Sequence, residues 1–331
     1  MKEKYLITGG AGHLGNTIVK QLLEQNQEVR VLVVPGEKNI PQGNIEICYG
    51  DVRNKKSLES FFQGSEGFRT ILIHSAGIVS IATKIDLLIY EVNVEGTKNI
   101  IDMSLEKKID KIIYVSSVHA ITEKPQGEII TETEDFDPEK VIGDYAKTKA
   151  EASRFVYGKI KEGYNINIVH PSGICGPYDH GKGHLTSLVI DYYKGRLTSG
   201  ISGGYDFVDV RDVAQGIINC AQKGGKGECY ILSNQYFKVA ELLDLLHEIT
   251  GKKRITRFLP YWFIKATAPL AELYYKVLHR PPLYSPYSIY TLTSNAHFSH
   301  DKATRELGYN NRAMKETLLD TVNWLKEQNR I

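Results

Sequence analysis

Tyr145 and Lys149 stand four residues apart in the stretch GDYAKTKAE, which has a helical pattern. In a helix, side chains at positions i and i+4 lie on one face. A phenol with a pKa near 10 is a slow acid or base at neutral pH, and a nearby ammonium group lowers that pKa. A unit charge about 5 Å away contributes roughly 3 kcal/mol, or about two pKa units, at an effective dielectric of about 20. The pair therefore suits proton transfer to a substrate oxygen, although the same spacing also occurs by chance on surface helices.

A second candidate is the glycine-rich stretch YLITGGAGHLGNTIV, which follows a strand pattern and opens a helix pattern. Glycine permits a tight turn and a close approach of the backbone to a pyrophosphate, whose charge is favoured at a helix N-terminus. The spacing is G-x-x-G-x-x-G instead of the commoner G-x-G-x-x-G, and an ordinary strand–helix turn is the alternative. In this context we predict a dinucleotide site formed by Gly9, Gly12, His13, Leu14 and Gly15.

The end of the second predicted strand bears on the choice between NAD and NADP. An acidic residue there binds the ribose 2′-OH of NAD, whereas an arginine pairs with the 2′-phosphate of NADP. Val33 and Val34 occupy those positions, so neither determinant is present. The lack of a carboxylate there and the nearby Lys38 favour NADP over NAD, with a solvated loop lysine as the alternative for Lys38.

Two further predicted strands end in residues that suit a cofactor. Asp51 and Val52 follow the third strand, where the Asp51 carboxylate could accept a hydrogen bond from the adenine amino group. Ser75, Ala76 and Gly77 follow the fourth strand, where small residues let the backbone lie along the cofactor.

The order and spacing of these motifs resemble the extended short-chain dehydrogenase/reductase family, of the NAD-dependent epimerase/dehydratase type, over nearly the whole chain. The matching segments are TGGAGHLG (8–15), GD (50–51), HSAG (74–77), NVEGTKN (93–99), YVSS (114–117), YAKTK (145–149), HPSGICGP (170–177) and DFVDVRDVA (206–214). The resemblance implies that Tyr145 is the general acid/base and that Lys149 also hydrogen-bonds the nicotinamide ribose. It further implies a serine hydroxyl that polarises the substrate oxygen. Alignment of the strand favours Ser117 for this role over Ser116, which would then cap the backbone.

The same resemblance places other residues around the cofactor. Asn93 begins a family helix motif, where a structural role is favoured over a proton relay. Pro171 and Ser172 match the segment that flanks the nicotinamide, although His170 stands where arginine is commoner. A structural ion-paired motif without a catalytic role is expected at Asp209, Arg211 and Asp212.

The elements that must position these residues follow a strand–helix alternation. Predicted strands cover 4–8, 28–34, 44–50, 70–76, 111–117, 165–171 and 228–233, and helical patterns cover 13–25, 92–108, 238–250 (closed by Gly251) and about 314–328. Such alternation predicts right-handed βαβ units, and near-continuous apolar strands predict a sheet covered on both faces. We therefore expect an α/β fold, with a Rossmann doubly wound parallel sheet and a smaller, mostly helical C-terminal substrate domain.

The glycine-rich loops after Pro171 mark where the alternation ends. We expect residues 1–170 to form the NAD(P)-binding domain, rejoined by about 205–235. Residues 171–204 and 236–331 would form the substrate-binding region.

Composition excludes several classes. The chain has 331 residues, 42% hydrophobic and 24% charged, as in soluble globular proteins, and a net charge of +2 argues against a nucleic-acid partner. Four scattered cysteines without a C-x-x-C motif fit a cytoplasmic protein.

The most apolar window, 258–278, contains Lys265, Glu272 and two prolines, so it predicts no membrane span. A helix on a membrane surface and a lid over an apolar pocket are the alternatives for this window. His180 and His184 have helical metal-site spacing in a glycine-rich loop, and no metal is expected.

Two reactions fit the motifs. One interconverts a ketone and a secondary alcohol on an apolar small molecule, as in dihydroflavonol reductase-like and 3β-hydroxysteroid dehydrogenase-like members. The other is epimerisation or dehydration of a nucleotide sugar with tightly held NAD. Nucleotide-sugar members typically carry a basic residue before DF, where this chain has Tyr205, and the segment from Pro177 to Tyr205 is short for that class. The first reaction is also favoured by aromatic residues that suit a flat apolar substrate, namely Tyr261, Trp262, Phe263, Tyr274, Tyr275, Tyr284, Tyr287 and Tyr290.

A third possibility is a nucleotide-sensing module without catalysis. Such relatives usually lose the Tyr/Lys pair, which is intact here. The family resemblance also suggests a homodimer through helices near 92–108 and 145–162.

Overall fold

The computed structural model describes residues 2–80, 87–181, 183–260, 262–263 and 286–331. Most of the apolar window 258–278 lies outside these ranges. So do four of the aromatic residues predicted for the substrate site, namely Tyr261, Tyr274, Tyr275 and Tyr284.

The main sheet has seven strands, all parallel, in the order β10-β6-β5-β4-β1-β2-β3. These strands are β1 (Lys2–Thr8), β2 (Glu28–Val33), β3 (Glu46–Tyr49), β4 (Phe68–His74), β5 (Lys111–Val115), β6 (Ile166–Pro171) and β10 (Cys229–Leu232). Strands β2 and β3 lie on one side of β1, and β4, β5, β6 and β10 lie on the other side, in that order. The loops after β1 and β4 therefore diverge at the position where doubly wound sheets bind nucleotides. The predicted Rossmann sheet is confirmed.

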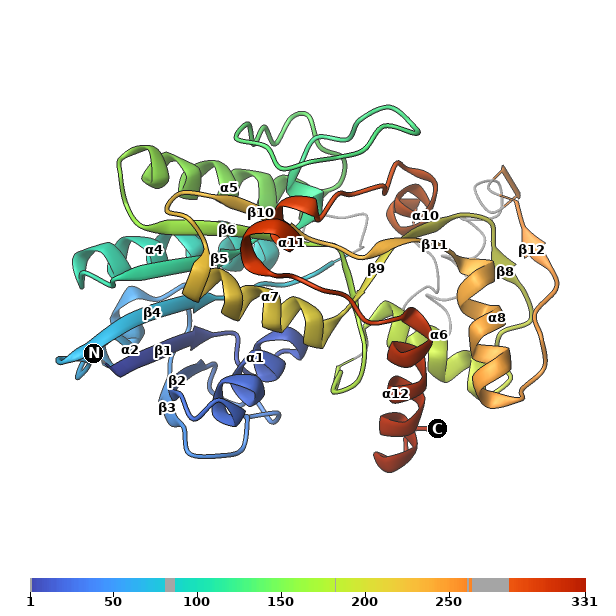
Figure 1. The fold of residues 1–331 in the computed structure, drawn as a ribbon, viewed down its shortest axis with the longest axis horizontal. Coiled ribbons are helices and arrows are strands. Elements are labelled where there is room, and N and C mark those ends of the chain that lie inside the picture. Colours follow the sequence, from blue (N-terminus) through green and yellow to red (C-terminus); the bar gives the residue numbers. More distant parts are fainter. Residues whose placement is uncertain (1, 81–86, 182, 261, 264–285) are drawn as a thin grey trace.

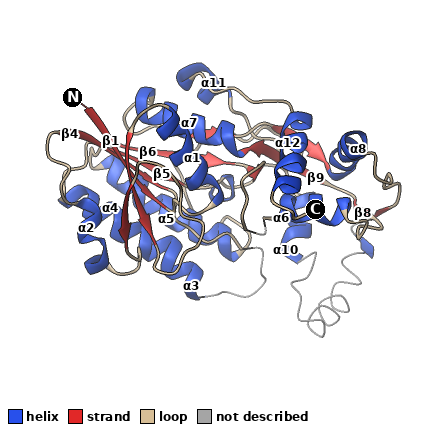
Figure 2. Ribbon diagram, turned by 90° about the horizontal axis from the view of Figure 1, so that it is seen from below, coloured by secondary structure: helices blue, strands red, loops and turns tan. Residues whose placement is uncertain are grey.

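Helices cover both faces of this sheet because its strands are apolar on both sides (Figures 1 and 2). One core lies under α1 (His13–Glu24), α7 (Val210–Lys223) and α11 (Asp301–Leu307). The other core lies under α2 (Glu59–Phe62), α4 (Thr97–Glu106) and α5 (Asp144–Lys161). In Figure 1, α4 and α5 lie above the sheet, while α1 and α7 lie below it.

The helix predicted at 92–108 is part of a longer run. It begins with α3 (Leu87–Tyr90), continues through a π-helical segment, η2 (Glu91–Gly96), and ends with α4. A Cβ at Gly96 would lie 2.6 Å from the Val52 side chain, so glycine lets the run pack closely against the loop after β3. Two short 3₁₀ helices also occur, η1 (Lys55–Leu58) and η3 (Val118–Ala120).

The remaining elements gather on the right of Figure 1. They are a three-stranded sheet of β7 (Gly173–Cys175), β9 (Gly204–Asp209) and β11 (Gln235–Lys238), the short pair β8 (Gly200–Ile201) and β12 (Phe258–Leu259), and the helices α6 (His184–Tyr193), α8 (Val239–Thr250), α10 (Pro286–Thr293) and α12 (Met314–Glu327). A third core joins α6, α8 and α12 through side chains such as Leu242, Leu246 and Leu318. As predicted, α8 ends at Gly251, which has a φ of +65°.

Ion pairs connect the start of α7 to α12. The Arg211 guanidinium lies 2.7 Å from Asp209 and 2.6 Å from Asp320 on α12. Arg312, just before α12, lies 2.8 Å from Asp212. The prediction that Asp209, Arg211 and Asp212 are ion-paired is confirmed. Within the described ranges, no helix combines the length and the apolar character needed to cross a membrane.

Candidate active site

The glycine-rich turn between β1 and α1 is shaped by close backbone contacts. Gly9 has a φ of +72°, and a Cβ there would lie 2.7 Å from the backbone nitrogen of Ala76. A Cβ at Gly15 would lie 2.1 Å from the Gly9 carbonyl oxygen. Gly12 caps α1 without a side-chain hydrogen bond, and the first turn of α1 has no acidic residue. The turn therefore fits a pyrophosphate, which would meet free N–H groups at the positive end of the helix.

The side chains of His13 and Leu14 serve the fold. The His13 ring nitrogen Nε2 lies 2.8 Å from the carbonyl oxygen of Pro177, and burial lowers the pKa of this imidazole. Leu14 packs against the core under α1. These two residues can therefore contribute only backbone groups to an anion at the helix start, while His13 ties α1 to the loop after β7.

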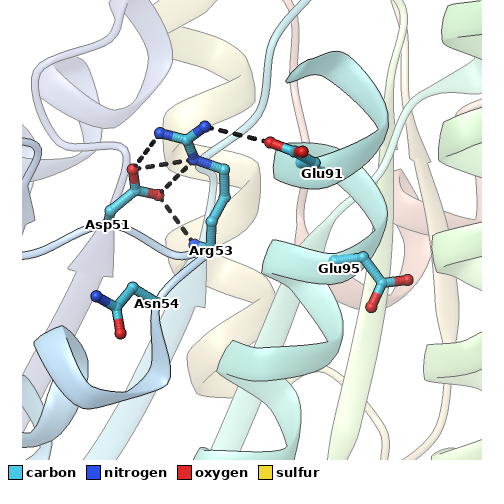
Figure 3. Close-up of a pocket in the computed structure, with 5 residues that line it drawn as sticks. All are labelled: Asp51, Arg53, Asn54, Glu91 and Glu95. Atoms are coloured by element: carbon cyan, nitrogen blue, oxygen red, sulfur yellow. Dashed lines mark hydrogen bonds and ion pairs between the residues drawn. The ribbon is translucent and has the colours of Figure 1, made fainter. Parts of the chain in front are cut away.

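Asp51 lies in the loop after β3, beside a cavity of about 550 Å³ lined by Asp51, Arg53, Asn54, Glu91 and Glu95 (Figure 3). The Arg53 guanidinium lies 2.6 Å from Asp51 and 3.3 Å from Glu91, so it bridges the two carboxylates. Hydrogen bonds from Arg53 lower the pKa of the Asp51 carboxyl. Arg53 donates to both Asp51 oxygens through its backbone N–H, its Nε and its Nη2, so the protein itself already occupies this carboxylate. Val52, next to it, is buried in the core.

The tip of β2 carries few polar groups. Val33 is buried, and Val34 is 46% exposed. Charged side chains appear only at Glu37 and Lys38, both exposed in the following loop.

The loop after β4 is bonded to the end of β1. The Ser75 hydroxyl donates to the Thr8 carbonyl oxygen at 2.7 Å, and the Ala76 N–H donates to the Thr8 hydroxyl at 3.3 Å. The Thr8 hydroxyl also lies 2.7 Å from Nδ1 of His74, which is fully buried. Burial, with a smaller contribution from the Lys149 charge, lowers the pKa of His74 to about 3. The loop is thus held beside the glycine-rich turn by neutral hydrogen bonds.

Asn93 fastens this loop to α5. Its side-chain oxygen accepts from the Ile78 N–H at 2.8 Å. Its amide nitrogen donates to the Ile78 carbonyl at 3.0 Å and to the Thr148 hydroxyl at 3.2 Å. A Cβ at Gly77 would lie 3.3 Å from the same Asn93 oxygen. The amide is therefore occupied by the protein itself, which supports a structural role.

Tyr145 lies in the first turn of α5, opposite the loop after β5. Its side chain is buried, and burial raises its pKa to about 12, while a hydrogen-bonding interaction with Ser117 opposes the rise. We expected the Lys149 charge to lower this pKa, but burial dominates in the structure. Tyr145 is therefore a protonated phenol at neutral pH, as a general acid requires.

The two serines after β5 face different partners. The Ser116 hydroxyl lies 2.6 Å from the Ser153 hydroxyl on α5. The Ser117 hydroxyl accepts from the His119 N–H at 3.2 Å and also interacts with Tyr145. The geometry therefore places the Ser117 hydroxyl, and not that of Ser116, beside the Tyr145 phenol.

Lys149 lies one turn after Tyr145 and is buried. Its ammonium group donates to the Val115 carbonyl oxygen at 3.0 Å and lies 5.3 Å from the centre of the Tyr114 ring. A Cβ at Gly77 would lie 3.4 Å from the same nitrogen, so Lys149 also borders the loop after β4. Burial lowers the pKa of Lys149 to about 8.

His119 is a site residue that sequence reasoning missed. Its ring centre lies 5.9 Å from that of Tyr145, 5.7 Å from that of Tyr205 and 6.0 Å from that of Tyr287. Its Nε2 lies 3.0 Å from the Tyr205 hydroxyl, and its Nδ1 lies 3.4 Å from the Tyr287 hydroxyl. The sequence feature that could have identified His119 is its position two residues after Ser117. Its contact partners could not be predicted, because they come from β9 and α10, far along the chain.

Of the predicted aromatic residues that the structure describes, only Tyr287 and Tyr290 join the group around His119. Tyr287 lies in this cluster, and Tyr290 stacks on it with ring centres 6.3 Å apart. Trp262 and Phe263 are instead 69% and 40% exposed.

The end of β6 holds a buried polar cluster. Pro171 pairs with Leu232 of β10, and the Ser172 hydroxyl donates to the carboxylate of Asp206. Asp206 is fully buried, and burial raises its pKa to about 6. His170 lies 3.1 Å from the Ser117 carbonyl oxygen through Nδ1, and burial lowers its pKa to about 4. Ser172 is therefore occupied by a protein partner, while His170 supports the serine loop from behind.

His180 and His184 lie outside this site. The His180 ring packs edge-on against Trp324 at 5.3 Å, and His184 begins α6. In the part of the chain that the structure describes, no three His, Cys, Asp or Glu side chains form a group that could hold a metal ion.

Comparisons with known proteins agree with this architecture. A family model described as the NAD dependent epimerase/dehydratase family matches residues 5–233. Sterol demethylase protein B of Methylococcus capsulatus is 28% identical over 98% of this chain and 99% of its own. The 3beta-hydroxysteroid-dehydrogenase/decarboxylase isoform 1 of Arabidopsis thaliana is 29% identical over 98% of this chain and 80% of its own. The crystal structure of gox2253 superposes over 100% of both chains, with a TM-score of 0.86 and 28% identity.

The matched residues run from β1 to just beyond β10, and thus include the glycine-rich turn, Ser117, Tyr145 and Lys149. The chain therefore belongs to the NAD-dependent epimerase/dehydratase family, the extended short-chain dehydrogenase/reductases that its sequence motifs resemble.

Proposed function

We propose that this protein interconverts a ketone and a secondary alcohol on an apolar small molecule, with a nicotinamide cofactor. The observation that carries the proposal is the Ser117–Tyr145 pair beside an uncharged wall of His119, Tyr205 and Tyr287. Two hydroxyl donors that converge there suit a carbonyl oxygen, and aromatic rings suit an apolar body.

Each proposed catalytic residue has a role that follows from its surroundings. Tyr145, protonated at neutral pH, donates its proton to the oxygen of a ketone and becomes a phenolate; in the reverse direction the phenolate accepts the proton of the alcohol. The Ser117 hydroxyl donates a second hydrogen bond to that oxygen. Lys149 supplies a nearby positive charge and binds the cofactor ribose. The nicotinamide, when bound, supplies or accepts the hydride.

We assign cofactor binding to the loops that meet beside β1 and β4. Backbone groups of Gly9, Gly12, His13, Leu14 and Gly15 hold the pyrophosphate. The adenine end is assigned to Asp51 and Val52, and the nicotinamide end to Ser75, Ala76, Gly77 and Pro171. Asn93 and Ser172, whose side chains bind protein partners, would shape this end of the site from behind. Lys38 favours NADP, because it is the exposed cation closest along the chain to the tip of β2.

The substrate class follows from the wall and from the relatives. Tyr205 replaces the basic residue that nucleotide-sugar members typically carry, and it contacts the neutral His119. Two relatives that span nearly all of this chain carry sterol or hydroxysteroid in their names. We therefore place the substrate among polycyclic ketones or alcohols, bound in the region of residues 171–204 and 236–331. Epimerisation or dehydration of a nucleotide sugar is the second candidate, because the family description names both reactions.

The test is oxidation of NADH and of NADPH, each followed at 340 nm, with ketosteroids, dihydroflavonols, aryl ketones and UDP- or dTDP-sugars. Ketone reduction that Tyr145→Phe lowers at least 100-fold is the expected result, since general acid catalysis contributes about 10²- to 10⁴-fold. A changed sugar product without net cofactor oxidation, and no ketone turnover, would instead establish the second candidate. Cofactor binding by the Tyr145→Phe protein, measured from NADPH fluorescence, controls for misfolding.

A further inference from the structure

His119 connects the proposed general acid to two tyrosines that the reaction itself does not require. His119 lies two residues after Ser117 in the chain, in η3, and its ring contacts that of Tyr145 edge-on at 5.9 Å. Tyr205 and Tyr287 occupy its two ring nitrogens, at 3.0 Å and 3.4 Å. Three elements, η3, β9 and α10, therefore meet at this imidazole.

The protonation state of the group follows from burial. Burial lowers the pKa of His119 to about 4, so the imidazole is neutral at physiological pH. Burial also raises the pKa values of Tyr205 and Tyr287 far above 10, so both phenols keep their protons. The charged residue nearest in sequence to the ring, Glu123, hydrogen-bonds Tyr290, and its negative charge also helps to raise the pKa values of Tyr205 and Tyr287. His119, Tyr205 and Tyr287 thus form an uncharged triad.

The donors of this triad outnumber its internal hydrogen bonds. A neutral imidazole has one N–H donor and one acceptor nitrogen, and each phenol has one O–H donor. If Nδ1 carries the proton, Tyr205 donates to Nε2, His119 donates to Tyr287, and the Tyr287 O–H is left over. If Nε2 carries it, the Tyr205 O–H is left over. In either tautomer one buried phenolic O–H has no acceptor among the described residues.

A buried donor without an acceptor is costly, so such groups normally have a partner. We propose that the spare O–H of this triad binds a second oxygen of the substrate, and that His119 is the positioning residue that holds the donor in place. This inference rests on the proposed function and narrows its substrate class. The substrate would be an apolar ketone or alcohol with a further hydroxyl or carbonyl oxygen.

The position of that second oxygen is limited by geometry. His119 contacts Tyr145 directly, with ring centres 5.9 Å apart, so the triad borders the proposed general acid. A hydroxyl on the carbon next to the carbonyl is therefore the position that the experiment tests. A neutral donor also favours an uncharged acceptor, because no cation of the triad offsets the desolvation of an anion.

The experiment compares ketones that differ by one hydroxyl next to the carbonyl. The pairs are flavanone with 3-hydroxyflavanone, 1-tetralone with 2-hydroxy-1-tetralone, and 5α-cholestan-3-one with its 2-hydroxy derivative. Equilibrium binding is measured with the oxidised cofactor present, so that no turnover is needed. We expect the wild type to bind the hydroxylated member of at least one pair about tenfold more tightly, the effect of one buried hydrogen bond.

The variants locate that preference. One of the two variants Tyr287→Phe and Tyr205→Phe should abolish the preference for the hydroxylated ketone. Which of them does so identifies the phenol that carries the spare donor. His119→Leu should abolish it, whereas His119→Gln, which keeps a donor and an acceptor, should restore part of it. The preference is read in each variant as the ratio of the two ketone affinities, and affinity for the cofactor should change less than twofold, which a merely destabilised fold would not give.

Two results would overturn the inference. One is equal binding of both members of every pair by the wild type, or no binding of either. The other is a preference that persists in His119→Leu and in both tyrosine variants. A preserved preference without ketone turnover under reduced cofactor would contradict the proposed function alone.

Discussion

The Lys149 ammonium group donates a hydrogen bond to the Val115 carbonyl oxygen at 3.0 Å. Val115 is the last residue of β5, directly before the two serines. The lysine therefore holds α5 against the strand that presents Ser117, one turn away from Tyr145. Its burial makes the charged form costly, and this cost leads to the first prediction.

Activity should depend on the charge of Lys149. Burial lowers its pKa to about 8 from an ordinary 10.5, so the ammonium loses its proton as the pH rises through about 8. We expect kcat/KM for ketone reduction to fall about tenfold per pH unit above that value. Lys149→Arg, which stays charged, should remove this limb of the pH profile, and Lys149→Met should be weakly active at every pH.

The same shift affects stability with a definite sign. Between about pH 8 and 10.5 the unfolded chain binds more protons at Lys149 than the folded chain does. The contribution of Lys149 to the free energy of unfolding should therefore rise with pH across this window.

For activity, a pH–rate profile of Lys149→Arg that matches the wild type would show that another group causes the fall in kcat/KM at high pH.

Ser116 and Ser117 should separate stability from activity. Ser117→Ala removes the hydroxyl beside Tyr145, and we expect kcat/KM to fall about 100-fold with little change in stability. Ser116→Ala removes the 2.6 Å bond to Ser153 and should lower the free energy of unfolding by about 1 kcal/mol, with kcat nearly unchanged. Steady-state kinetics and urea unfolding of both variants test this, and the reverse pattern would assign the catalytic hydroxyl to Ser116.

Gly9→Ala should disrupt the cofactor site, with Gly36→Ala as its matched control. Both glycines have positive φ values, +72° and +92°. A Cβ at Gly9 would lie 2.7 Å from the Ala76 nitrogen, whereas nothing lies within 4 Å of one at Gly36. Each substitution should cost roughly 1 kcal/mol of backbone strain. Only Gly9→Ala should also weaken NADPH binding at least tenfold, which fluorescence titration measures. Equal NADPH affinity in both variants would contradict the assignment of the glycine-rich turn to the cofactor pyrophosphate.

Three histidines with lowered pKa values should make the fold sensitive to acid; His74 and His170 are buried, and His119 is partly exposed. Burial lowers the pKa of His74 to about 3 and those of His119 and His170 to about 4. Below the ordinary histidine pKa of 6.5, the unfolded chain gains protons that the folded chain excludes. The free energy of unfolding therefore decreases as the pH is lowered. Asp206, whose pKa burial raises to about 6, partly offsets this loss.

The expected net loss in the free energy of unfolding is roughly 2 to 3 kcal/mol per pH unit between pH 6 and 5. Urea unfolding at pH 7, 6 and 5 measures it. His170→Phe should reduce this pH dependence of stability by the contribution of one histidine. The variant should still fold, because the new ring can stack on Phe136. A wild-type stability that is constant from pH 7 to 5 would contradict this account.

Cofactor choice should respond to Lys38. Lys38 is exposed after the tip of β2, and loss of one charge–phosphate contact weakens binding by about tenfold or less at a solvated site. We expect Lys38→Ala to raise the KM for NADPH three- to tenfold while the KM for NADH changes less than twofold. An equal change for both cofactors would assign Lys38 to the solvated loop.

Local patterns in the sequence determined much of this protein. Alternating apolar strands and amphipathic helices predicted the parallel sheet, because strand and helix periods depend on neighbouring residues. The turn from Gly9 to Gly15 and the one-turn spacing of Tyr145 and Lys149 are local in the same sense. Boundaries were less well determined, since the helix predicted at 92–108 begins at Leu87 and passes through a π-helical segment.

Only the tertiary structure decided how side chains from distant segments meet. Tyr205 and Tyr287 lie 86 and 168 residues from His119 along the chain, and no local pattern relates them. Which serine lies beside Tyr145 depended on where α5 packs, because the Ser116 hydroxyl meets Ser153 and the Ser117 hydroxyl interacts with Tyr145. The pKa of Tyr145 likewise depended on burial, which overrode the charge four residues away. Spacing along a helix predicts which groups can meet, but desolvation by the surrounding fold decides their protonation.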